Sequence, residues 1–238
     1  MTQRTNEYGL PVGDPVPGWT ARPRPGPEPM VGRYCTLEKL DAAKHADGLF
    51  EAYMEAPDGR DWTYLFVDRP ATREAYREYA EKNAASPDPY HYAIRDNATG
   101  LLIGTSSLMR IDPAMGVIEV GNITYSPRIQ KRPAGTEAQY LQMRRAFDEL
   151  GYRRYEWKCD SLNAPSRAAA TRYGFVFEGI FRQAVIYKGR NRDTAWFSIT
   201  DKEWPRVRAA FEAWLDPSNF DRAGRQKRSL SDLRAAPK

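Results

Sequence analysis

Residues 123–138 read ITYSPRIQKRPAGTEA, a pattern that predicts the end of a β-strand followed by a loop that leads directly into a helix. The spacing of Thr136 and Gln139 predicts a helix that begins at Thr136 and ends near Leu150. Free N–H groups and the positive end of the helix dipole face the loop before such a helix, where they attract anions. The loop also supplies cations and small residues that favour a bound phosphate, namely Lys131, Arg132, Ala134 and Gly135.

A second strand-to-helix junction follows at residues 160–167, which read DSLNAPSR. Asn163 stands at the N-cap position, and Pro165 lies in the first turn, where a missing N–H is harmless. Ligands commonly bind at the carboxyl ends of parallel strands. We therefore expect an extended ligand to lie between the strands that end at Tyr125 and Asp160.

Outside these junctions, hydrophobic periodicity predicts a mixed α/β domain with a meander of antiparallel strands in its middle. Turn clusters at residues 96–100 and 112–116 separate the strands of that meander. The expected strands are residues 31–37, 90–95, 101–111, 117–125, 152–159, 175–188 and 193–199, and the expected helices begin after Asp41 and cover residues 72–83, 136–150, 163–173 and 201–215.

The chain divides into three parts by composition. Residues 1–32 hold seven of the 18 prolines, a density that excludes helix and central strand and predicts an extended arm. Residues 33–216 are expected to form the folded domain, and residues 217–238 a basic tail. From Arg222 onward, six basic side chains and one acidic side chain account for the whole net charge of +5. Because the body is neutral, the tail is typical of a solvated end, and we expect no nucleic-acid partner.

Composition also bears on the cellular compartment and on whether a membrane or a metal is bound. Mean hydropathy is −0.71, and no run of about 18 apolar residues occurs, so we expect no membrane partner. No charged and then apolar leader opens the chain, which favours a cytoplasmic protein. Two cysteines and two histidines are too few for a disulfide framework or a zinc site, so we expect no bound metal.

The two junctions resemble motifs of the GNAT superfamily of N-acyltransferases, most closely its RimJ/RimL-like branch. Residues 130–138, QKRPAGTEA, are similar to the loop that binds the pyrophosphate of acyl-CoA. Residues 163–166, NAPS, followed by Gly-Phe at 174–175, are similar to the segment that contacts the pantetheine arm. The order of elements agrees with the family over about residues 31–200.

This resemblance implies an acetyl-CoA-dependent N-acetyltransferase. Its fold would be a mostly antiparallel central sheet flanked by helices, with a V-shaped opening between two parallel strands. Acetyl-CoA would be the co-substrate, and its pantetheine amides would pair with the backbone of residues 123–125. The residues to which the resemblance gives a cofactor-binding role are Ile123, Thr124, Tyr125, Gln130, Lys131, Arg132, Ala134, Gly135, Thr136, Asn163 and Ser166.

Two positions depart from the family pattern. Pro133 replaces a glycine and removes one N–H donor, so contact with phosphate must rely more on Lys131 and Arg132. Ala170 stands where many members have a tyrosine that acts as the general acid, and Tyr173 lies on another side of the helix. The departing thiolate must therefore take its proton from water or from another group.

Acetyl transfer requires a neutral amine and a polarised thioester carbonyl. The candidates for the general base are Glu119, on the strand of residues 117–125, and Asp160, at the end of the next strand. A backbone N–H near Ile123 is the expected group that polarises the carbonyl. Glu156 and Lys158 share strand parity with Asp160, so a cross-strand ion pair is the structural alternative for this cluster.

The sequence therefore predicts acetyl transfer to a primary amine by direct attack in a ternary complex, with a small molecule or a protein N-terminus as acceptor. A catalytically silent acyl-CoA-binding module of the same fold is the alternative, and Ala170 and Pro133 favour it. A nucleic-acid binder that uses the basic tail is a third and less favoured hypothesis. An edge strand near the C-terminal hairpin allows a homodimer.

Overall fold

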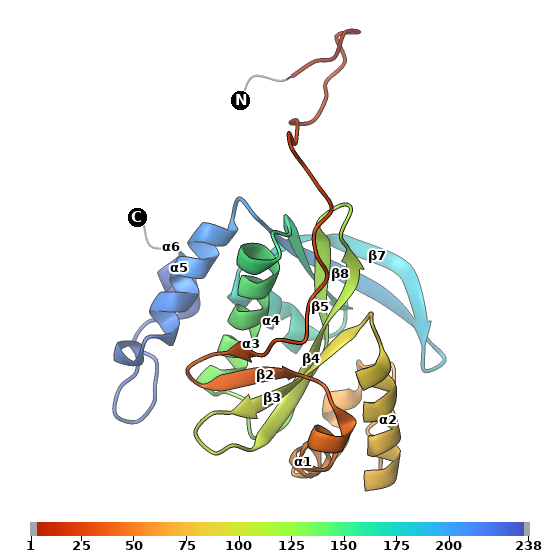
Figure 1. Ribbon diagram of the computed structural model, residues 1–238, viewed down its shortest axis with the longest axis vertical. Helices are drawn as coiled ribbons and strands as arrows, with labels where there is room; N and C mark the ends of the chain where they lie inside the picture. Colours follow the sequence, from red (N-terminus) through yellow and green to blue (C-terminus); the bar gives the residue numbers. More distant parts are fainter. Residues whose placement is uncertain (1–3, 236–238) are drawn as a thin grey trace.

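In the computed structural model, which describes residues 4–235, eight strands form one sheet in the order β1-β2-β3-β4-β5-β6-β8-β7 (Figure 1). All neighbouring strands are antiparallel except β5 and β6, which run parallel. The predicted class, a mixed and mostly antiparallel sheet with one parallel pair, is confirmed. The strands are β1 (Met30–Val31), β2 (Cys35–Lys39), β3 (Tyr90–Asp96), β4 (Leu102–Asp112), β5 (Val117–Tyr125), β6 (Arg154–Asp160), β7 (Val176–Tyr187) and β8 (Arg190–Thr200).

Helices cover both faces of the sheet (Figure 1). On one face, α1 and α2 form a hydrophobic cluster that contains Leu49, Tyr53 and Ala93. Neighbouring residues of a strand point to opposite faces, so Tyr92 and Ile94, on either side of Ala93, point to the other face. There they join a larger hydrophobic cluster with α3, α4 and α5. No helix within residues 4–235 combines the length and apolarity needed to cross a membrane. The α-helices are α1 (Ala42–Met54), α2 (Arg73–Ala85), α3 (Pro133–Arg144), α4 (Ala164–Tyr173), α5 (Trp204–Leu215) and α6 (Leu230–Ala235). Two short 3-10 helices, η1 (Arg60–Trp62) and η3 (Pro217–Asn219), and a π-helical segment, η2 (Arg145–Glu149), complete the helical elements.

The sequence signals for helix starts are confirmed at α1 and α4 but not at α3. Asp41 and Asn163 cap α1 and α4 with their side chains, as predicted. By contrast, α3 begins at Pro133 and not at Thr136, because the fixed φ of proline suits the first helical position and its missing N–H is not needed there. The predicted capping box is wrong: the Thr136 hydroxyl instead accepts a hydrogen bond from Arg172, at 3.0 Å.

The two ends of the chain are arranged differently. Residues 4–29 form an extended arm, which Figure 1 shows leaving the sheet. Trp19 attaches this arm to the domain by donating from Nε1 to the carbonyl of Ala114, at 2.7 Å. The tail differs from the expected solvated end, since it folds back so that α6 contacts α4 and α5, and Leu230 is buried.

The parallel strands β5 and β6 pair over only part of their length. Their register runs from Val117 opposite Arg154 to Val120 opposite Trp157, and it ends there. Immediately beyond, Asn122 has a φ of 48°, and β5 bulges against β4. A bulge bends its strand, so the last residues of β5 diverge from β6. This divergence is the V-shaped opening expected from the sequence.

Glu137 fastens α3 to the first two strands. Its buried carboxylate accepts hydrogen bonds from the backbone N–H groups of Arg33, Tyr34 and Cys35, at 2.8, 2.6 and 2.8 Å. Gly32 lies beside this carboxylate, where a Cβ atom would clash with it. The contact therefore fixes the first turns of α3 against the sheet, next to the opening between β5 and β6.

Replacing Glu137 with Ala is expected to lower the free energy of unfolding by about 3 kcal/mol, because one buried and two partly buried N–H groups lose their acceptor. Urea denaturation followed by circular dichroism measures this change. The control is Glu81→Ala on the exposed side of α2, which should change stability by less than about 0.5 kcal/mol. Equal stability of the two variants would contradict the role of Glu137.

Candidate active site

Two cavities lie near the end of β5. The first cavity has a volume of about 580 Å³ and lies at the start of α3. The second cavity, of about 150 Å³, lies in the wedge, which we define as the space between residues 121–125 and residues 158–160. Gln130 of the first cavity donates from Nε2 to Oδ2 of Asp61 in the second, at 3.3 Å. The two cavities therefore adjoin.

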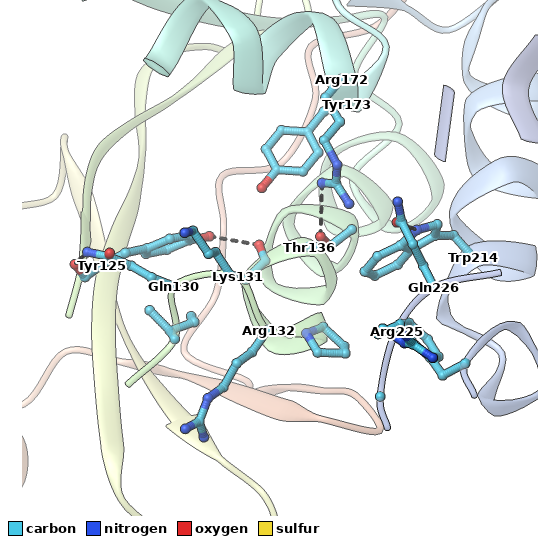
Figure 2. Close-up of a pocket in the computed structure, with 15 residues that line it drawn as sticks. Tyr125, Gln130, Lys131, Arg132, Thr136, Arg172, Tyr173, Trp214, Arg225 and Gln226 are labelled. Atoms are coloured by element: carbon cyan, nitrogen blue, oxygen red, sulfur yellow. Dashed lines mark hydrogen bonds between the residues drawn. The ribbon is translucent and has the colours of Figure 1, made fainter. Parts of the chain in front are cut away.

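Cations surround the first cavity, which is enclosed by the start of α3, the end of α4 and a turn near the C-terminus (Figure 2). Lys131 and Arg132 come from the loop before α3, Arg172 from α4 and Arg225 from the tail. Among the described residues, no aspartate or glutamate lines this cavity. Clustered cations without carboxylates favour a ligand with several negative charges.

The backbone at the start of α3 offers fewer donors than an ordinary helix start. Pro133 has no N–H, and the N–H of Gly135 is directed at the carbonyl of Arg132, 3.2 Å away. The side chain of Ala134 packs into the core and away from the cavity. An anion bound here therefore depends on cationic side chains as well as on helix amides.

Tyr125 joins the end of β5 to the first turn of α3. Its hydroxyl donates to the carbonyl of Gly135 at 3.0 Å and accepts from Nε2 of Gln139 at 2.9 Å. Burial raises the pKa of Tyr125, so the hydroxyl remains protonated and able to donate. A Cβ atom on Gly135 would lie only 3.3 Å from the Tyr125 ring. The small size of Gly135 therefore serves this ring contact as well as access to the cavity.

An ion cluster faces the second cavity. Glu119 of β5 and Glu156 of β6 are register partners, and Nζ of Lys158 lies 2.9 Å from Glu119 and 2.6 Å from Glu156. The cross-strand ion pair considered as the structural alternative is therefore present. Burial raises the pKa of Glu119, and the charge of Lys158 opposes that rise. Oε1 of Glu119 has no hydrogen bond within residues 4–235, so one carboxylate oxygen is left for a ligand.

Asp160 also lines the second cavity, but both of its oxygens are engaged. One accepts from the N–H of Leu162 and the other from the hydroxyl of Tyr187, each at 2.8 Å. Burial, followed by the neighbouring Asp160, raises the pKa of Tyr187 to about 12, so this hydroxyl keeps its proton. The geometry therefore favours Glu119 over Asp160 as the carboxylate that accepts a proton.

The segment between α1 and α2 forms one wall of the second cavity. Phe66 lines this cavity, and the guanidinium of Arg192 lies over its ring at 5.5 Å. At the tip of the β7–β8 hairpin, Nζ of Lys188 donates to the carbonyl of Trp62 at 2.9 Å. These contacts hold the segment against the hairpin and leave a narrow space beside Glu119.

The structure divides the predicted site residues between the two cavities. Two of them line neither cavity: Thr124, whose carbonyl accepts from the hydroxyl of Tyr53 at 3.1 Å, and Ala134, which packs in the core. The first cavity is lined by Tyr125, Gln130, Lys131, Arg132, Gly135 and Thr136, and the second by Glu119, Ile123, Asp160, Asn163 and Ser166.

Sequence reasoning missed the part of the first cavity that the C-terminal region builds. Arg172, Trp214, Arg225 and Gln226 all line it. The excess of cations in the tail is the one signal in the sequence that points to such a role. The bulge at Asn122 was also missed, because an asparagine with positive φ interrupts no hydrophobic pattern.

The chain is similar to several known proteins. Residues 35–176 match the family described as the acetyltransferase (GNAT) domain. The crystal structure of a GCN5-related N-acetyltransferase from Brucella melitensis is 52% identical and has a TM-score of 0.90, over 92% of this chain and 99% of that one. A probable acetyltransferase of the GNAT family from Chromobacterium violaceum is 35% identical with a TM-score of 0.77, over 82% of this chain and 98% of that one.

One relative bears a more specific name, "Putative ribosomal N-acetyltransferase YdaF", from Bacillus subtilis (strain 168). It is 25% identical over 183 residues, which are 73% of this chain and 95% of the relative. A ribosomal acetyltransferase among the relatives agrees with the RimJ/RimL-like branch expected from the sequence.

Proposed function

The chain belongs to the GNAT family of acetyltransferases, and we propose that it transfers the acetyl group of acetyl-CoA to a primary amine. The observation that carries this proposal is the wedge between β5 and β6, which opens beside a cation-lined cavity at the start of α3. Such a pair of cavities fits a long molecule with a polyanion at one end and an uncharged, amide-containing arm at the other. Acetyl-CoA has this composition.

Each part of acetyl-CoA has a matching surface in this proposal. The diphosphate would be held by Lys131, Arg132 and the first turn of α3. The pantetheine arm would lie along residues 121–125, whose edge toward β6 has no partner strand within the described chain. Asn163 and Ser166 at the start of α4 would form the opposite side of this channel.

Acetyl transfer forms a bond between the amine nitrogen and the carbonyl carbon, breaks the carbon–sulfur bond and releases CoA as a thiol. In our proposal, Glu119 accepts the proton of the ammonium group, directly or through a water, because its raised pKa makes it a stronger base than an exposed glutamate. A backbone N–H near Ile123 polarises the thioester carbonyl. Positioning of the two reactants supplies much of the remaining rate.

The thiolate that leaves takes its proton from water in this scheme. Ala170, at the position of the family's acid tyrosine, is fully buried. Tyr64 is the one tyrosine that lines the second cavity among the described residues, and its hydroxyl donates to the carbonyl of Leu162 at 3.2 Å. No tyrosine of the second cavity therefore replaces the missing acid.

For the acceptor, we propose the N-terminal amine of a protein. The relative named as a ribosomal N-acetyltransferase supports a protein substrate. A small-molecule amine is the alternative that the assay below distinguishes.

We place the protein in the cytoplasm. Cys35 and Cys159 are both unpaired and buried, which suits a reducing compartment. Burial raises the pKa of the Cys159 thiol, so this cysteine remains a thiol at neutral pH.

We also propose that two copies associate through β7. This strand lies at the edge of the sheet, where backbone donors and acceptors are available for pairing. It exposes several large apolar side chains, with Phe181 59% and Ile186 82% exposed. Pairing of two β7 strands would cover this apolar surface.

The purified protein is expected to release CoA from acetyl-CoA in the presence of an acceptor, measured with a thiol reagent. Peptides with ribosomal-protein N-termini should react faster than small amines. CoA at about 100 times its dissociation constant should raise the free energy of unfolding by roughly 2.7 kcal/mol. Stabilisation by CoA without turnover of any amine would favour the silent binding module, and absence of stabilisation would refute the proposal.

Glu119→Gln is expected to lower kcat/KM by roughly 10²- to 10⁴-fold, because a general base is lost. In the unmodified protein, kcat/KM should fall as pH drops through the raised pKa of Glu119, since the base must be unprotonated; this acidic limb should vanish in the variant. The control is Glu156→Gln, which removes a carboxylate from the same cluster but not from the cavity lining. Equal loss in both variants would assign the effect to the ion cluster.

Phe181→Glu is expected to shift the protein from dimer to monomer in size-exclusion chromatography with light scattering, because a charge at an apolar contact opposes association. Met115→Glu, at a position 60% exposed outside β7, is the control and should leave the dimer intact. An unmodified protein that is monomeric at micromolar concentration would refute pairing through β7.

A further inference from the structure

Residues 220–226, here called the C-terminal turn, are held in a defined place against α5. Phe220 and Gln226 form an isolated β-bridge that closes the turn. Trp214 donates from Nε1 to Oε1 of Gln226 at 2.8 Å, and its ring meets that of Phe220 edge-on at 5.2 Å. The C-terminal turn is therefore a folded part of the domain.

The C-terminal turn forms the far wall of the first cavity, opposite the loop before α3 (Figure 2). Arg225 lines this wall. Arg172 enters the cavity from α4, where it donates to the hydroxyl of Thr136 at 3.0 Å and lies over the ring of Trp214 at 5.0 Å. Arg172 and Arg225 thus reach the cavity from elements other than the loop that carries Lys131 and Arg132.

The charges of this cavity exceed what a diphosphate alone requires. Lys131, Arg132 and Arg172 form no ion pair within residues 4–235. Arg225 pairs with Asp221, Nε to Oδ2 at 2.9 Å, and this carboxylate does not line the cavity. A second phosphate, separate from the diphosphate, would account for the two additional guanidinium groups.

We propose that Arg172 and Arg225 bind the 3′-phosphate on the ribose of CoA, so that the C-terminal turn belongs to the co-substrate site. This inference rests on the proposed function, because it concerns the same ligand. Guanidinium groups pair with phosphate through two parallel hydrogen bonds, so they bind a phosphate at a defined position more strongly than a general excess of positive charge does. The chain should therefore distinguish CoA from 3′-dephospho-CoA, which has the same diphosphate and pantetheine arm.

Isothermal titration calorimetry of the full chain with CoA and with 3′-dephospho-CoA tests this. The unmodified protein should bind CoA about tenfold more tightly than 3′-dephospho-CoA. Arg225→Gln and Arg172→Gln should each reduce that preference to about threefold or less, and Arg225→Gln should leave the affinity for 3′-dephospho-CoA unchanged. Thermal unfolding of each variant checks that the fold is retained, and Arg225 is exposed enough to be replaced without disturbing the core.

The control is Arg222→Gln, which removes the same charge from the same turn at an exposed position outside the cavity lining. It should keep the preference for CoA. Equal affinity of the unmodified protein for both ligands would overturn the inference and leave the proposed function standing. An equal loss for both ligands in Arg225→Gln, or an effect of Arg222→Gln as large as that of Arg225→Gln, would also overturn it. Failure of the unmodified protein to bind either ligand would overturn the proposed function and the inference together.

Discussion

The short parallel pairing of β5 and β6 is the constraint on which the site depends. Hydrogen-bonded pairing stops at Val120 opposite Trp157, and the bulge at Asn122 turns β5 away from its neighbour. Full pairing would close the wedge and satisfy the strand edge that we assign to the pantetheine arm. The bond from Tyr125 to Gly135 then sets the start of α3 directly beyond the end of β5. One strand thus places both the channel and the anion site.

The two cavities differ in the charge of the residues that line them. Among the described residues, every charged residue that lines the first cavity is a cation, which suits a ligand rich in phosphate. The second cavity combines carboxylates with Lys158, which neutralises part of a like-charged pair formed by Glu119 and Glu156. Burial in that cluster keeps Glu119 more basic than an exposed glutamate. In our proposal, the first cavity therefore attracts the polyanionic end of acetyl-CoA, and the second supports proton transfer.

Much of the fold could be predicted because its signals are local. Caps such as Asp41, the left-handed Gly174 at the end of α4 and the turn clusters at residues 96–100 and 112–116 act over a few neighbouring residues. The start of α3 was misplaced because two local signals compete there, and the proline at 133 prevails over the capping spacing at 136.

The site was predictable to the extent that it lies on the two strand-to-helix junctions, whose motifs are contiguous in the sequence. Arg172 and Arg225 were not, since their meeting in one cavity depends on how α4 and the folded-back tail pack around the start of α3. No local pattern carries that information. Thr124 and Ala134 show the converse: both lie within a motif, yet their side chains are buried in packing and line neither cavity.

A crystal structure of this chain with bound CoA tests the proposal that the wedge holds the co-substrate. We expect the diphosphate to lie against Lys131, Arg132 and the first turn of α3, with the pantetheine arm along residues 121–125 in the wedge. A ligand bound elsewhere on the molecule, or a wedge in which β5 and β6 pair to their ends, would contradict it.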